Sequence, residues 1–204
     1  MFVLLAALAI LVVVSMLPTQ RGRRDSANRP ADARLNVVCT FLPMYVFARN
    51  VVGDVPGVNV ELLVSSGVGC PHDYAVRPRD RRLVADADVI VANGLGLDAF
   101  VEKLADDPGK ILLLSENCDV IHDEADEHDH HGHDHEHEHE HGAACNHDHH
   151  GHDHGSVNPH VWVSPRQAAI QVRALGHGLA ARDPEHAAAY RANAAAYADR
   201  LTAL

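Results

Sequence analysis

The stretch Leu35-Asn-Val-Val-Cys-Thr-Phe41 decides the fold, because a short apolar run of this kind is typical of a fully buried β-strand. Pro43 follows it and predicts a helix through about Val52, since proline is favoured in the first turn of a helix. Gly53-Asp54 and Pro56-Gly57 interrupt that helix, and a second apolar run comes next. The chain therefore starts as strand, helix, strand.

The same alternation continues downstream. Further strands are expected at residues 58–64, 88–92 and 110–115, with helices at residues 79–87 and 97–105. Short apolar runs that alternate with helical patterns are typical of a parallel α/β sheet. Because ligands of such sheets collect at the carboxyl ends of the strands, the loops that leave those ends are where a binding site is expected.

Two more helices are expected near the C-terminus. Ser164-Pro165-Arg166-Gln167 predicts a helix start, with Ser164 as N-cap and Gln167 placed to close a capping box. Asp183-Pro184 starts the last helix, along which an apolar face recurs at Tyr190, Ala194, Tyr197, Leu201 and Leu204. No Gly, Asn or Pro ends that pattern, so we expect the sequence to be incomplete on its C-terminal side.

The charge of the chain is concentrated in one segment. The 204 residues include 28 acids and 17 Lys and Arg, for a net charge of −11. Residues 122–154 hold 11 of the acids and no Lys or Arg, so the remaining 17 acids balance the 17 basic residues. A nucleic-acid-binding protein needs a basic face, and none is indicated here. The 47% of hydrophobic residues can bury a core, which excludes wholesale disorder.

Residues 122–154 also contain 14 of the 18 histidines. We expect a disordered loop over residues 119–156, because nothing in its repeats can be buried and a loop of this length is uncommon unless functional or disordered. Imidazole is largely neutral near pH 7, and the interleaved carboxylates attract dications, so the loop is interpreted as a metal collector. Repeats that expanded without a function are the alternative. The collecting histidines are His128, His130, His131, His133, His135, His137, His139, His141, His147, His149, His150, His152 and His154.

Two other histidines each follow a proline in a loop. His72 follows Pro71 in the loop that leaves the second strand, and His160 follows Pro159 shortly before a helix. Either one alone is ambiguous, but two histidines braced in this way on one edge of the sheet suit a preformed metal site. Imidazole nitrogen suits Zn²⁺, whereas Mn²⁺ favours oxygen and is the second choice. Zinc prefers four ligands, so two are not sufficient by themselves.

The cysteines and the other motifs exclude some chemistry. No C-x-x-C spacing is present, which argues against a structural zinc knuckle. An oxidising compartment permits disulfides, with three complete pairings possible, whereas Cys39 is expected to be a small buried strand residue. A catalytic zinc needs three protein ligands and a nearby base, and no H-E-x-x-H or comparable set occurs, so we expect no enzyme.

The N-terminal segment indicates the compartment. Residues 1–17 are apolar apart from Ser15, a length between a signal-peptide core and a membrane span, and residues 1–33 are interpreted as signal or anchor with a basic linker. Either interpretation places the rest of the chain in the periplasm or otherwise outside the cytosol. The arginines that follow the apolar run favour the opposite orientation, a cytoplasmic C-terminal side, which is the alternative.

Several stretches, in this order and with a His-rich insert before the last, resemble one known family. They are residues 37–50, 71–80, 85–89 and 93–97, and Asn158-Pro-His-Val-Trp162. The family is that of the solute-binding proteins of zinc and manganese ABC transporters, also called cluster A-I or zinc-uptake binding proteins. The resemblance extends over about residues 35–204, which corresponds to the N-terminal half of a member.

The resemblance implies two α/β lobes joined by a long helix, with the metal in the cleft between them. His72 and His160 match the first two ligands of the family, and a third histidine and a carboxylate come from a second lobe that this chain lacks. Residues 34–182 then form the N-terminal lobe, and residues 183–204 are the start of the interlobe helix.

The function expected on these grounds is extracytoplasmic capture of Zn²⁺ by a monomer that delivers it to an ABC permease in the membrane. The alternative is a membrane-tethered zinc buffer or sensor that acts through the His-rich loop alone.

Overall fold

The structure, a computed structural model, describes residues 30, 32–65, 67, 74–121 and 157–204. Its four strands form one sheet in the order β2-β1-β3-β4, and every neighbouring pair is parallel. The expected parallel α/β fold is therefore confirmed. The strands are β1 (Leu35–Cys39), β2 (Val58–Leu62), β3 (Val89–Ala92) and β4 (Ile111–Leu113).

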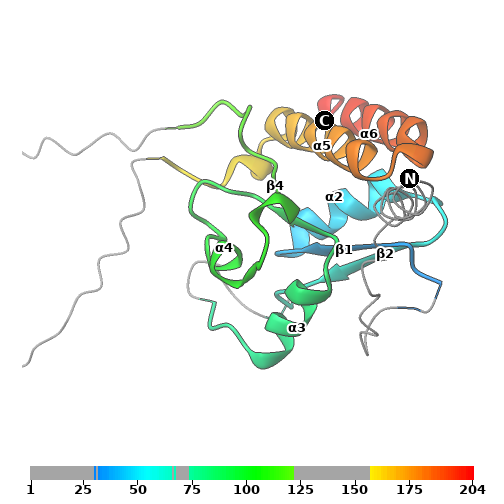
Figure 1. Cartoon of the computed structure of the whole chain (residues 1–204). Coiled ribbons are helices and arrows are strands. Elements are labelled where there is room, and N and C mark those ends of the chain that lie inside the picture. The colour runs from blue at the N-terminus through cyan, green and yellow to red at the C-terminus, as the bar shows by residue number, and fades with distance from the viewer. Residues whose placement is uncertain (1–29, 31, 66, 68–73, 122–156) are drawn as a thin grey trace, which may run out of the picture.

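Helices cover both faces of this sheet (Figure 1). One face is covered by α2 (Leu42–Val52), α5 (Pro165–Arg182) and α6 (Ala187–Thr202). The opposite face is covered by α3 (Pro78–Asp86) and α4 (Phe100–Leu104). Three short 3-10 helices complete the described chain, namely η2 (Pro108–Lys110), η3 (Val161–Val163) and η4 (Pro184–His186).

Burial on both faces explains why the central strands are mainly apolar and do not alternate between apolar and polar residues. In β1, Val37 and Cys39 enter the core beneath α2 and α5, whereas Val38 enters the core beneath α3. Cys39 is 0% exposed, as expected for a small buried strand residue, and burial raises the pKa of its thiol. Among the cysteines that the structure describes, Cys39 and Cys118 are both free thiols.

The helix expected at residues 97–105 is shorter than predicted, because α4 begins only at Phe100. Gly94, Leu95 and Gly96 all have positive φ, at 88°, 56° and 79°, so the chain makes a tight loop after β3. The buried Asp98 carboxylate holds this loop by accepting the backbone N–H of Gly94 at 2.9 Å. The loop conformation and this local hydrogen bond therefore delay the start of the helix.

The predicted capping box at the start of α5 is wrong. Ser164 is the N-cap, but its side chain makes no capping hydrogen bond. The Gln167 amide instead pairs with Asp119, donating from Nε2 to Oδ2 over 3.1 Å and accepting the Asp119 backbone N–H over 3.0 Å. Gln167 thus ties α5 to the segment after β4.

The apolar face predicted for the last helix is confirmed over most of its length. Tyr190 and Ala194 are buried, and Tyr197 and Leu201 are partly buried against the same core. Leu204 lies beyond the end of the helix and is 92% exposed. No helix within the described ranges is long and apolar enough to cross a membrane, and residues 1–17 lie outside those ranges.

Candidate metal site

His160 lies at the edge of the sheet formed by the carboxyl ends of β1 and β3. Phe41, which follows β1, packs edge-on against Trp162 with ring centroids 4.8 Å apart. Asn93, which follows β3, donates from its side-chain amide to the Pro159 carbonyl over 3.0 Å. The loop that carries His160 is therefore fixed at the sheet edge where ligands of parallel α/β proteins bind.

The imidazole of His160 is held in one orientation by Asn158. The Asn158 Oδ1 atom lies 2.9 Å from the ring Nδ1 and also accepts the His160 backbone N–H over 3.0 Å. Because an amide oxygen only accepts, Nδ1 carries the proton and Nε2 carries the lone pair. The ring centroids of Trp162 and His160 lie 5.1 Å apart, and His160 is exposed. Nε2 is therefore the ring nitrogen whose lone pair is of the kind that binds a metal ion.

His72 lies outside the described residues, as do Cys70, Cys145 and the thirteen histidines of the expected collecting loop. The described chain resumes at Tyr74, two residues after His72, and is anchored there. Tyr74 donates its hydroxyl to Asp80 Oδ2 over 2.8 Å and packs on Phe100 with ring centroids 5.5 Å apart. Desolvation and the neighbouring Asp80 raise the pKa of the Tyr74 hydroxyl, so it remains a proton donor at neutral pH.

A second cluster of metal-ligating side chains, which the sequence analysis did not single out, lies at the start of the last helix. Asp183, Glu185 and His186 offer ligand atoms within 4.8 Å of one another. The Arg34 guanidinium already occupies the centre of this cluster, 3.1 Å from Asp183 Oδ1, 3.3 Å from Glu185 Oε2 and 3.0 Å from His186 Nδ1. These groups therefore hold an internal cation, and Arg34 directly precedes β1, at the opposite end of that strand from Phe41.

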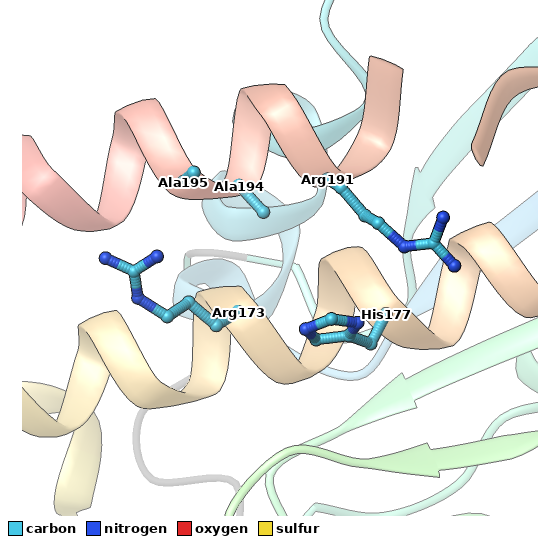
Figure 2. A pocket seen from close by; sticks show the side chains of 5 residues that line it. All are labelled: Arg173, His177, Arg191, Ala194 and Ala195. Atoms are coloured by element: carbon cyan, nitrogen blue, oxygen red, sulfur yellow. The ribbon is translucent and has the colours of Figure 1, made fainter. Parts of the chain in front are cut away.

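A shallow groove of about 230 Å³ runs between α5 and α6. It is lined by Arg173, His177, Arg191, Ala194 and Ala195, and the two guanidinium groups point toward opposite ends of it (Figure 2). Arg173 is paired with Asp199 at 2.7 Å. The two guanidinium groups of the lining disfavour a dication, so this groove is not a candidate metal site.

Comparison with known proteins identifies the family of the chain. The family described as "ZnuA: Zinc-uptake complex component A periplasmic" matches residues 37–204. The zinc-binding lipoprotein AdcA of Streptococcus pneumoniae is 33% identical over 186 residues, which cover 88% of this chain and 33% of AdcA. The manganese ABC transporter substrate-binding lipoprotein ScaA of Streptococcus gordonii is 27% identical over 212 residues, which cover 100% of this chain and 58% of ScaA.

A solved structure of a metal-bound protein has a similar fold. The solute-binding protein FpvC of Pseudomonas aeruginosa, solved in complex with Ni²⁺, superposes with a TM-score of 0.62 at 28% identity, over 83% of this chain and 52% of that one. The chain thus spans between about a third and somewhat over half of the length of these relatives. The chain belongs to the ZnuA family of solute-binding proteins of zinc and manganese ABC transporters.

Proposed function

We propose that this chain is the metal-capturing lobe of a zinc solute-binding protein that delivers Zn²⁺ to an ABC permease. The observation that carries the proposal is the fixed imidazole of His160, whose Nδ1 is paired with Asn158 at the carboxyl edge of the sheet. Residues 34–182 form this lobe, and residues 183–204 are the start of the helix that leads to a second lobe. His160 and His72 supply its two ligands, and the second lobe supplies the others.

The sheet topology supports the pairing of His160 with His72. The loop that contains His72 follows β2, whereas the loop of His160 is tied to the end of β3, and both strands are neighbours of β1. Neighbouring strands are about 4.8 Å apart, so two strands that flank a third are separated by about 10 Å. Loops that rise from such positions can direct two imidazoles toward one ion.

Zinc is the proposed cargo because both ligands of this lobe are imidazoles, which suit Zn²⁺ better than Mn²⁺. AdcA is named for zinc, whereas ScaA is named for manganese. The histidines of residues 122–154 add a weak collector that raises the local zinc concentration beside the site without tight individual binding. An extracytoplasmic location, reached through residues 1–17, suits this role and the relatives named as lipoproteins or periplasmic components.

The decisive experiment titrates the full chain with Zn²⁺ and monitors binding through the fluorescence of Trp162. This residue is the single tryptophan of the chain, and its ring lies 5.1 Å from the His160 ring. The wild-type protein should show a saturable change in fluorescence that His160→Ala removes. His177→Ala is the matched control, because His177 is exposed on α5, lines the basic groove and should leave the response intact.

The same titration separates the proposal from the zinc buffer or sensor alternative. If the His-rich segment alone matters, replacing both His72 and His160 by alanine will leave zinc binding almost unchanged. A His160→Ala variant that titrates like the wild type would contradict the proposed site.

A further inference from the structure

The buried side chain of Asn93 joins the end of β3 to the loop that carries His160. It is 0% exposed, and its Nδ2 atom donates to the carbonyls of Gly94 and Pro159, each over 3.0 Å. Pro159 is 66 residues away in sequence and directly precedes His160. Asn93 therefore makes a tertiary contact with the peptide from which the proposed ligand projects.

The orientation of the Asn93 amide is fixed by two further partners. Its Oδ1 atom accepts from Ser115 Oγ over 3.1 Å and from Gln171 Nε2 over 2.9 Å, and Gln171 Nε2 also donates to Ser115 Oγ over 2.8 Å. All three side chains are buried. Exchanging the oxygen and nitrogen of Asn93 would place its oxygen against the carbonyls of Pro159 and Gly94, so only one amide orientation satisfies the network.

The backbone of Asn93 is also immobilised. Its N–H donates to Asp98 Oδ2 over 2.7 Å, and the same oxygen accepts the Thr40 hydroxyl over 2.7 Å. Burial raises the pKa of Asp98, and the hydrogen bonds from Thr40 and from the Gly94 and Asn93 backbone oppose that shift. This carboxyl group joins the ends of β1 and β3, so the backbone from which the Asn93 side chain projects is held in place.

The peptide bond between Pro159 and His160 is consequently held at both of its polar atoms. Asn93 binds its carbonyl oxygen, and Asn158 Oδ1 accepts its N–H over 3.0 Å. Fixing both atoms fixes the plane of that peptide. Together with the φ of −80° at His160, this plane sets the direction in which the Cα–Cβ bond leaves the backbone.

The geometry points to Asn93 as a positioning residue for metal capture. It sets the direction of the His160 imidazole before the ion arrives, whereas Asn158 sets the tautomer of the ring. This inference rests on the proposed function, in which His160 is a ligand. Removing a side chain that orients a ligating histidine typically lowers metal affinity by about 10- to 100-fold. Asn93 acts on His160 through the backbone and not by direct contact with the ring, so we expect Asn93→Ala to lower zinc affinity by about tenfold.

The test compares Asn93→Ala with Ser115→Ala in the full chain. Each variant is titrated with Zn²⁺ alone, and binding is monitored through Trp162 fluorescence. Ser115 belongs to the same buried network, but it makes no hydrogen bond to Pro159, and Gln171 Nε2 still holds Asn93 Oδ1 when the Ser115 hydroxyl is removed. Both variants should be destabilised in urea, whereas the zinc midpoint should rise about tenfold only for Asn93→Ala. In a His160→Ala background, Asn93→Ala should cause no further loss of zinc affinity in competition with a chelator.

Other outcomes separate the two proposals. If His160→Ala leaves the fluorescence response unchanged, the proposed function fails. If His160→Ala removes the response but Asn93→Ala titrates like the wild type or like Ser115→Ala, only the positioning role is overturned. If Asn93→Ala does not fold, Asn93→Ser replaces it, because its hydroxyl ends one bond short of the Nδ2 position and should give the same rise in midpoint.

Discussion

Replacing Tyr190 by phenylalanine tests the buried hydrogen bond between Tyr190 and Asp183 at the start of the last helix. Tyr190 is fully buried, and its hydroxyl donates to Asp183 Oδ2 over 2.7 Å. Arg34 Nη1 donates to the other oxygen of Asp183 over 3.1 Å. Burial acts to raise the pKa of Asp183, but the hydrogen bonds from Tyr190, His186 and Arg34 outweigh it and leave that pKa below its ordinary value. The carboxylate is therefore ionised in the folded protein.

A hydrogen bond to a charged group contributes about 1.5–3 kcal/mol. Because phenylalanine keeps the ring and its packing, Tyr190→Phe should lower the free energy of unfolding by about 2 kcal/mol at neutral pH. A carboxyl group whose pKa is depressed by folding stabilises the protein fully above its unfolded pKa of about 3.9. That contribution is lost as the pH falls through the lower pKa of the folded state. The difference between wild type and variant should therefore narrow in strong acid.

Urea unfolding across a pH series from neutral to strongly acidic measures this difference. Tyr197→Phe is the matched control, because Tyr197 lies on the same helix and packs on Phe47, with ring centroids 6.2 Å apart. Its hydroxyl makes no hydrogen bond within the part of the chain that the structure describes. The control should change the free energy of unfolding by less than about 0.5 kcal/mol. A Tyr190→Phe variant as stable as the wild type at neutral pH, or a difference independent of pH, would refute the assignment of the stability to this charged hydrogen bond.

Four further outcomes are expected. Gly176→Ala should lower the free energy of unfolding by about 1–3 kcal/mol, because the added Cβ would lie 2.5 Å from Ala194 Cβ and 3.2 Å from the Tyr190 carbonyl oxygen. Gly178→Ala should lower the stability less in thermal denaturation, because the three atoms nearest to its added Cβ all belong to the flexible Leu112 side chain. An equal loss would contradict this reasoning. Deleting residues 122–154 should lower the number of zinc ions bound per chain, measured by elemental analysis, more than it lowers the affinity of the tightest site. An equal loss of both would count against a separate collecting role for the histidines of this segment. Zinc should be released in equilibrium dialysis as the pH falls through about 6, because imidazole must be deprotonated to bind metal, whereas full retention at about pH 5 would exclude histidine ligation.

Local sequence determines much of the fold. The mainly apolar runs at residues 35–41 and 88–92 predict strands because the centre of a parallel sheet is buried on both faces. The alternation of strands with helices predicts the parallel α/β class, and Pro159 followed by His160 marks a loop of the ligand-binding edge. These features act over a few residues or follow from connectivity, so they can be derived from the chain alone. The pairing of His160 with His72 stays a prediction.

Only the tertiary structure decides which polar side chains meet. Gln167 sits where a capping box is expected, but it bonds to Asp119, 48 residues earlier. Arg34 meets Asp183 across 149 residues, and Asn93 meets Pro159 across 66. Each of these pairs forms because parallel crossovers return distant segments to the same end of the sheet. Buried or half-buried polar groups then take whichever partner lies within hydrogen-bond distance, and no local pattern encodes that choice.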